Sequence, residues 1–106
     1  MLAELSEVLG GDMAALIDTY LADAPALIAK LESAAVEPDY TQLYQAAHSL
    51  KSSSANLGAM TLSAAARRIE LGGRAGQLDR PAVAVAMLAD EFKRVRAALR
   101  AYKSAP

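Results

Sequence analysis

The single histidine of this 106-residue chain, His48, is the residue whose surroundings best suit chemistry. On a helix, side chains three and four positions apart share a face, which places Gln45, Lys51 and Ser52 beside the imidazole. An imidazole is partly neutral near pH 7, and it is nucleophilic at one ring nitrogen when the other nitrogen carries the proton. The face therefore combines a nucleophile, a cation and a small hydroxyl, a set that suits transfer of an anionic phosphoryl group.

The opposite stripe of the same helix is mostly apolar, which predicts a buried face with His48 at its accessible edge. The members of this stripe are Leu43, Ala47, Leu50, Ser54 and Leu57. The hydroxyls of Ser52 and Ser53 are small enough to hydrogen-bond a phosphoryl group on Nε2 without blocking its donor. A lone histidine on a helix is more often an ordinary surface or core residue. Here Lys51, the small residues that follow it and Gly58 occur together, and this combination favours the functional interpretation.

A resemblance to a known family is carried by three stretches, namely Ala47–Ser54, Leu57–Ala59 and Arg68–Glu70. They are similar to the histidine-containing phosphotransfer (HPt) domain of phosphorelays, and the likeness covers about residues 11–101. The resemblance implies that His48 carries the phosphoryl group and that Lys51 is its phosphate-facing cation. One position departs from the family, which usually has glycine four residues after the histidine, where this chain has Ser52.

The Nδ1 proton of the histidine needs an acceptor if Nε2 is to act as the nucleophile. By resemblance that acceptor is Glu70, which matches the family's Gln or Glu on the neighbouring helix. The alternative is that Glu70 is an exposed carboxylate near Arg67 or Arg74. Both interpretations remain open from the sequence.

Positive charge is concentrated around the histidine although the net charge of the chain is only −1. Residues 40–69 contain three cations and no acid, whereas residues 1–39 contain eight acids and one lysine. A patch of this size is too small for nucleic acid, which calls for a basic domain with many phosphate contacts. It suits an acidic protein pocket or a single phosphoryl group, and we assign partner binding to Lys51, Arg67 and Arg68.

An enzyme is not expected, because the chain has no glycine-rich phosphate loop, no Ser-His-Asp set and no Glu-x-x-His pair. We also expect no metal site and no cofactor of its own. A phosphoryl carrier without an ATP site needs a partner, and the resemblance implies receiver domains, whose aspartate pocket supplies Mg²⁺. The predicted function is a phosphorelay intermediate that accepts a phosphoryl group on His48 from a receiver aspartate and passes it to another receiver. The alternative is a docking module that binds a receiver or another regulator through the His48 surface without relaying phosphate.

The length predicts one domain spanning residues 1–106. Cysteine is absent, which excludes disulfides and thiolate metal sites and suits a reducing cytoplasm. No apolar run approaches the roughly 20 residues needed to cross a bilayer, and no signal peptide is evident. We therefore expect a cytoplasmic monomer, either free or as the cytoplasmic end of a hybrid sensor histidine kinase.

Composition rich in alanine and leucine predicts an all-α fold, an antiparallel four-helix bundle with an additional short N-terminal helix over residues 2–9. A helix from about residue 13 is expected to break or kink near Ala24 because of Pro25, with Asp23 capping its continuation. Either residues 2–9 or residues 12–23 would then lie across one end of the bundle.

The second long helix is expected from Tyr40 to Asn56, with Asp39 as its cap and Gly58 as its stop. The third begins near residue 59, and its last turn before Gly76 is expected to fray because of Gly72 and Gly73. The last helix begins near residues 79–81. Its apolar stripe comprises Val85, Leu88, Phe92, Val95, Leu99 and Tyr102, and the tail after Tyr102 is expected to be disordered.

Overall fold

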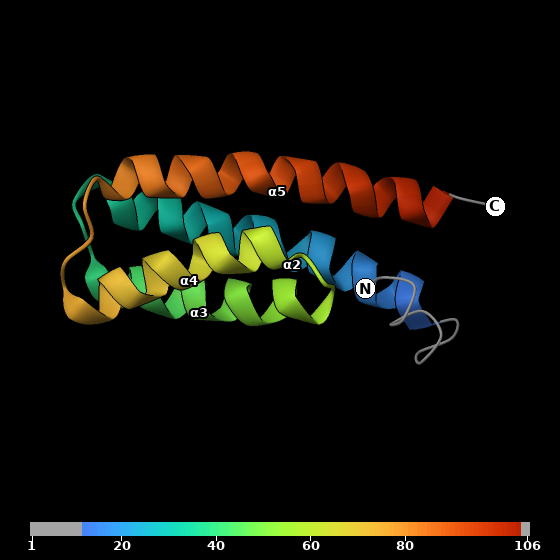
Figure 1. Ribbon diagram of the computed structural model, residues 1–106, viewed down its shortest axis with the longest axis horizontal. Helices are drawn as coiled ribbons and strands as arrows, with labels where there is room; N and C mark the ends of the chain where they lie inside the picture. The colour runs from blue at the N-terminus through green and yellow to red at the C-terminus, as the bar shows by residue number, and fades with distance from the viewer. Residues whose placement is uncertain (1–11, 105–106) are drawn as a thin grey trace.

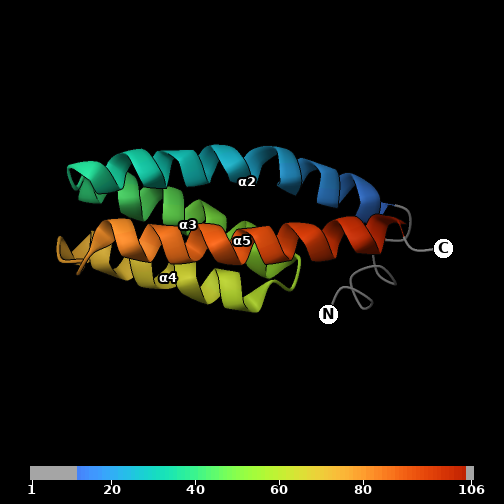
Figure 2. The same cartoon turned by 90° about the horizontal axis from the view of Figure 1, so that it is seen from above.

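The computed structural model describes residues 12–104, which form four helices: α2 (Asp12–Val36), α3 (Tyr40–Asn56), α4 (Met60–Ala75) and α5 (Pro81–Ser104). α2 and α4 each pack against α3 and α5, so the helices close an elongated antiparallel bundle of 45 × 20 × 18 Å (Figure 1). Figure 2 shows α2 and α5 running beyond the connection between α3 and α4. The predicted all-α bundle is confirmed, and the short helix expected over residues 2–9 lies outside the described residues.

α2 continues through Pro25 without interruption, so the predicted break near Ala24 is wrong. A proline in a helix interior removes one hydrogen bond and costs about 3 kcal/mol. The apolar face of α2 offsets this cost because it stays buried on both sides of the proline, which itself is exposed. Asp23 is consequently an exposed residue within the helix and caps nothing. Residues 12–23 belong to α2 and do not lie across one end of the bundle.

Both ends of α3 are determined by the residues that the sequence indicated. The Asp39 carboxylate accepts a hydrogen bond from the backbone N–H of Gln42 at 3.1 Å, which satisfies a donor in the first turn. At the other end Gly58 has φ +77°, a conformation that glycine adopts without a Cβ penalty. The N–H groups of Gly58 and Ala59 donate to the carbonyls of Ala55 and Ser54, each at 2.9 Å, and turn the chain into α4.

The core lies between the four helices and includes the whole predicted stripe of α3, namely Leu43, Ala47, Leu50, Ser54 and Leu57. Ser54 is its polar member, and its hydroxyl shares a 2.9 Å hydrogen bond with the hydroxyl of Tyr20. Burial raises the pKa of Tyr20, whose ring packs at 6.1 Å from that of Phe92. The buried pair is satisfied internally, so it joins α2 to α3 without an unpaired polar group.

The predicted stripe of α5 is confirmed, with Val85, Leu88, Phe92 and Leu99 buried and Val95 and Tyr102 partly buried. The helix begins at Pro81, where a missing N–H costs nothing. It continues to Ser104, and Lys103 forms an ion pair with Asp18 of α2, so the expected disorder after Tyr102 is wrong for these residues. Residues 105 and 106 lie outside the described range.

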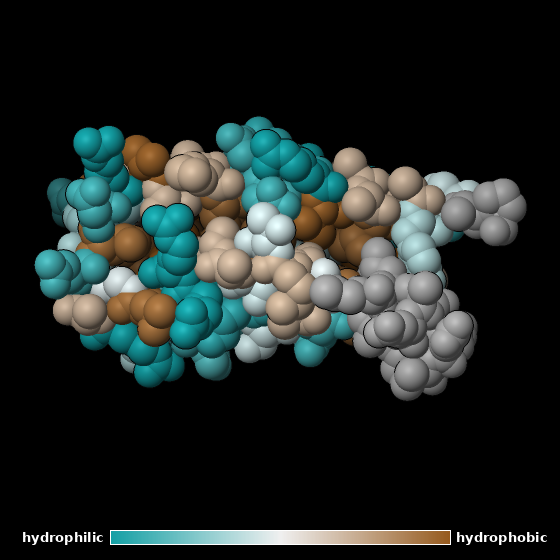
Figure 3. Space-filling model, in the orientation of Figure 1, coloured by the Kyte–Doolittle hydropathy of each residue, from teal (hydrophilic) through white to brown (hydrophobic). Residues whose placement is uncertain are grey.

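Apolar side chains are also visible on the surface between α4 and α5 (Figure 3). Val83 is 50% exposed and Met87 62% exposed, and both line a groove of about 490 Å³ between these two helices.

None of the helices within residues 12–104 is both long and apolar enough to span a lipid bilayer.

α4 runs to Ala75 through both glycines, so the fraying expected in its last turn is not observed. Gly73 is buried and faces the backbone of α3. A Cβ at this position would lie 2.9 Å from the Tyr40 carbonyl oxygen, and also 2.9 Å from the backbone nitrogen and Cβ of Tyr44. Glycine is therefore required here by the neighbouring backbone, whatever its intrinsic helix propensity.

We expect Gly73→Ala to destabilise the bundle, although this substitution favours an isolated helix by up to about 1 kcal/mol. The added methyl group must push α4 away from α3, which costs about 1–3 kcal/mol. The free energy of unfolding in urea measures the effect. Thr61→Ala, an exposed change on the same helix, is the control and should stay within about 0.5 kcal/mol of the native protein. A more stable Gly73→Ala variant would contradict the close approach.

Candidate functional site

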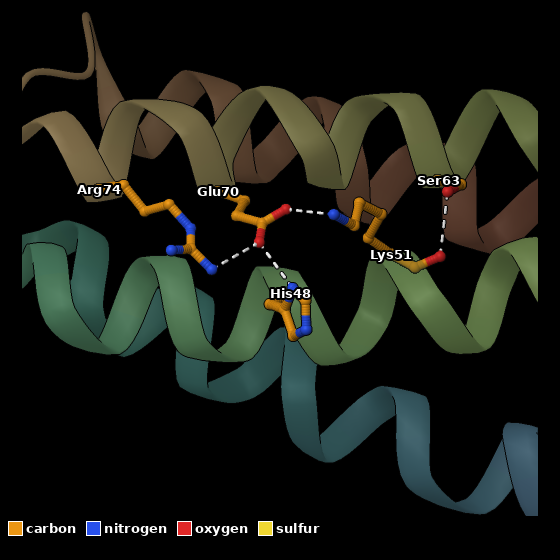
Figure 4. A network of polar contacts seen from close by, with 5 residues as sticks. All are labelled: His48, Lys51, Ser63, Glu70 and Arg74. Atoms are coloured by element: carbon orange, nitrogen blue, oxygen red, sulfur yellow. Dashed lines mark hydrogen bonds and ion pairs between the residues drawn. The ribbon is translucent and has the colours of Figure 1, made fainter.

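Glu70 lies at the centre of a polar network between α3 and α4, and its side chain is only 5% exposed. One carboxylate oxygen, Oε2, lies 2.6 Å from Nδ1 of His48 and 3.3 Å from a guanidinium nitrogen of Arg74. The other oxygen, Oε1, accepts from the Lys51 ammonium at 2.6 Å. Figure 4 shows the three donors converging on this carboxylate from two helices.

The carboxylate is ionised at neutral pH because its neighbours stabilise the charge. The hydrogen bond from Lys51 lowers the pKa of Glu70 most, the bond from His48 lowers it further, and burial opposes both, leaving a pKa of about 2. An ionised carboxylate accepts hydrogen bonds and donates none. Nδ1 of His48 must therefore carry the proton of this bond, which fixes the tautomer of the neutral ring.

His48 is held at the edge of the buried face, as its place beside the apolar stripe predicts. Its neighbours Ala47 and Leu50 are fully buried, whereas the His48 side chain is 53% exposed. Nε2 lies on the side of the ring away from Glu70 (Figure 4). The site thus presents an oriented imidazole to the surface with Nε2 available for reaction.

Two further contacts fix α4 relative to the histidine. The Ser63 hydroxyl donates to the backbone carbonyl of Lys51 at 3.0 Å. This bond lies at one end of the seam, which is the line of contact between α3 and α4 that contains Glu70. At the other end the Arg74 guanidinium lies 5.1 Å from the ring centroid of Tyr44, next to the close approach at Gly73. The seam is therefore joined on both sides of Glu70.

The structure brings together His48, Lys51 and Glu70 from the predicted set. Glu70 lies where the orienting role requires, and the exposed carboxylate considered as the alternative is wrong. Lys51 also differs from the expectation in one respect: its ammonium hydrogen-bonds Glu70, and its side chain is 29% exposed.

The remaining predicted residues on α3 are arranged unequally around the histidine. Gln45 and Ser52 are exposed within one helical turn of His48, on the face that their spacing predicts. Ser53 differs, because its hydroxyl donates to the Leu50 carbonyl at 3.2 Å. Its side chain lines a groove of about 260 Å³ between α2 and α3. The hydroxyl of Ser53 is therefore engaged away from the imidazole.

The predicted partner-binding cations do not form one patch. Arg67 and Arg68 are both exposed on α4, but consecutive helical residues point about 100° apart. Arg68 lines the groove between α4 and α5, whereas Lys51 lies in the seam between α3 and α4. A partner that covers His48 and Lys51 would therefore meet Arg68 only by extending over α4.

Sequence reasoning missed two contributors, Tyr44 and Ser63, and named Arg74 only as a possible neighbour of an exposed Glu70. Arg74 had a signal, because it lies four residues after Glu70 and shares its helical face. Tyr44 likewise lies one turn before His48 on α3. Ser63 had no such signal, since its contact depends on how α4 packs against α3.

In the described part of the chain, no group of three or more His, Cys, Asp or Glu side chains is placed to hold a metal ion. The site consists instead of one imidazole, one carboxylate and two cations.

Comparisons with known proteins agree on one family. Residues 15–98 match the family model described as the Hpt domain. The structure is similar to the crystal structure of histidine-containing phosphotransfer protein B (HptB) from Pseudomonas aeruginosa PAO1, with a TM-score of 0.90 and 31% sequence identity. The match covers 95% of this chain and 88% of that one. A search of curated proteins gave no significant match.

The network predicts a pH-dependent effect of Glu70→Gln on stability. The pKa of Glu70 is lowered on folding from 4.5 to about 2, so its carboxylate stabilises the fold fully above pH of about 4.5 and loses this contribution as the pH falls towards 2. We expect the variant to be less stable at pH 7 by about 1.5–3 kcal/mol, the range for hydrogen bonds to charged groups. The difference should shrink between pH 5 and 2.

Urea unfolding at several pH values measures this difference. Glu32→Gln is the matched control, because Glu32 is exposed on α2 and forms no ion pair within residues 12–104. It should have little effect at any pH. A Glu70→Gln variant as stable as the native protein at pH 7 would mean that the network contributes no net stability.

Proposed function

Because the chain belongs to the histidine-containing phosphotransfer family, we propose that it accepts a phosphoryl group on His48 from the aspartate of a receiver domain and passes it to a second receiver. The family makes it a phosphotransfer intermediate of two-component signalling. The observation that supports His48 as the acceptor is its 2.6 Å contact with Glu70, which leaves Nε2 exposed and unprotonated in the neutral ring.

In the proposed reaction the Nε2 lone pair attacks the phosphorus of the receiver's aspartyl phosphate. The bond between phosphorus and the aspartate oxygen breaks, the new bond joins phosphorus to Nε2, and the aspartate leaves as a carboxylate. The Nδ1 proton stays in its hydrogen bond to Glu70, whose negative charge stabilises the positive charge that develops on the ring. Transfer to the next receiver reverses these steps.

Lys51 lies one turn after His48 and supports the phosphorylated state electrostatically. Its ammonium is within hydrogen-bonding distance of Glu70, close to the ring that would carry the phosphoryl group. A cation there reduces the repulsion between the new phosphoryl charge and the Glu70 carboxylate. Ser52 and Gln45 are exposed on the same face and border the path of the incoming partner.

The partner would meet the remaining requirements of the reaction. A receiver domain would supply Mg²⁺ and the leaving carboxylate, and this chain would act as a carrier without an ATP site. We further propose that it works in the cytoplasm as a monomer, free or attached to a hybrid sensor histidine kinase. Lys51 lies within the site that a partner centred on His48 would cover, whereas Arg67 and Arg68 are exposed on α4 and Arg68 lies towards α5.

Incubation with a phosphorylated receiver domain and Mg²⁺ tests the function directly. The native protein should acquire acid-labile, alkali-stable phosphate, and His48→Gln should acquire none, because no other imidazole exists in the chain. Circular dichroism should show that the variant keeps its helical fold, since the His48 side chain is half exposed. Phosphate on the Gln variant would contradict the assignment. Binding of the receiver by the native protein without transfer would favour a docking module.

Substitutions at position 52 test whether the partner approaches His48 across this face of α3. We expect Ser52→Gly to retain transfer with a loss of a few tenths of a kcal/mol in stability, because glycine weakens a helix interior. Ser52→Leu should slow transfer by about tenfold or more, since a bulky side chain one turn after His48 obstructs the partner. Ser33→Leu, an exposed change on α2, controls for the added apolar surface. Wild-type transfer by a normally folded Ser52→Leu variant would show that the partner does not cross this face.

A further inference from the structure

We propose that Arg74 is a positioning residue for phosphoryl transfer: together with Lys51 it neutralises Glu70, so that the carboxylate orients His48 without favouring protonation of Nε2. This inference rests on the proposed function of His48 and adds a requirement to it. An orienting carboxylate has two opposite effects on an imidazole. It holds Nδ1–H in place, and it also stabilises the imidazolium ion, which has no lone pair at Nε2 and is not a nucleophile.

The charged and titratable groups around the imidazole lie on α3 and α4. On α3 these groups are Lys51 and the phenol of Tyr44, and on α4 they are Glu70 and Arg74. In the described part of the chain no hydrogen bond or ion pair connects His48 with α2 or α5. The protonation of the ring is therefore governed by one carboxylate and two cations.

The second cation, Arg74, changes the net charge around the ring. With Lys51 and Arg74 both present, the group around the ring carries one net positive charge before the imidazole is protonated. Without Arg74 it is neutral, and the imidazolium ion then meets a carboxylate balanced by a single cation. Arg74 and His48 contact the same oxygen, Oε2 of Glu70, so their charges lie close enough for direct repulsion. Arg74 thus opposes protonation of the ring that Glu70 orients.

The placement of Arg74 is determined by the backbone as well as by the ion pair. It follows Gly73, whose lack of a side chain allows α4 to approach Tyr44, and its guanidinium lies over the Tyr44 ring at 5.1 Å. This cation–π contact holds the guanidinium at a second point besides its ion pair with Glu70. The Arg74 side chain is nevertheless 56% exposed, so its replacement leaves the core intact.

The single histidine allows a direct measurement, because its imidazole resonances are unique in an NMR spectrum of the full chain. We expect Arg74→Gln to raise the pH midpoint of this titration by about 0.5–1 pH unit, at or below the low end for a nearby charge because Arg74 is partly solvated. Arg74→Lys, which keeps the charge, should restore most of the native midpoint. Arg100→Gln removes an exposed cation on α5 and should leave the midpoint unchanged. An unshifted midpoint in Arg74→Gln would overturn the inference.

Phosphorylation by phosphoramidate, a small donor that requires no receiver, supplies the kinetic test. The ratio of the Arg74→Gln rate to the native rate should fall below one at pH 6 and approach one as the pH rises to 8, because the effect of Arg74 on protonation disappears when the ring loses its proton in both proteins. A ratio independent of pH would overturn the positioning role while leaving His48 as the acceptor. If the native protein accepts phosphate from neither phosphoramidate nor a receiver, the proposed function fails, and the NMR midpoints still decide whether Arg74 controls the protonation of the ring.

Discussion

Burial of a carboxylate is the constraint on which the site depends. An ionised carboxylate removed from water costs several kcal/mol unless it is paired and hydrogen-bonded. Glu70 satisfies this requirement with donors from two helices, His48 and Lys51 on α3 and Arg74 on α4. Sliding or rotating one helix against the other would leave the buried charge unpaired. The same contacts that orient the imidazole therefore also fix the register of the two helices that carry it.

The parts of the fold that the sequence predicted well are those governed by local chemistry. Asp39 caps α3 because its carboxylate reaches a donor in the next turn, and Gly58 ends the helix because it adopts a positive φ. The apolar stripes of α3 and α5 are buried as their 3.6-residue period indicates. The position of His48 at the edge of one stripe follows from the same periodicity, so the exposure of the imidazole was predictable.

The errors arose where packing between helices overrides local preference. Pro25 and the pair Gly72 and Gly73 are helix breakers in isolation, yet α2 and α4 continue through them. In α2 the buried face on both sides of the proline outweighs one lost hydrogen bond. In α4 the absence of a side chain at Gly73 is what permits contact with Tyr44. A single sequence does not contain these distances, because they depend on the relative positions of two helices.

The same limit applies to the site residues. Spacing placed Lys51 beside His48, but whether its ammonium points to solvent or to Glu70 depends on the depth of the carboxylate in the seam. Spacing also offered both Arg67 and Arg74 as partners of Glu70, and the rotation of α4 selects Arg74. Arg68 was grouped with Lys51 by charge alone, whereas the helix directs it towards α5.

The tight turn at Gly58 has a consequence for how the protein can vary. It joins α3 directly to α4, so the imidazole and every group that controls its charge lie on one helical hairpin. Closing so short a loop has a small entropic cost, and the polar contacts of Glu70 all lie within this hairpin. The exposed residues of α2 and α5 are thus free to diverge among related proteins. A change in the surface chemistry of the outer helices would therefore leave the charges around His48 as they are.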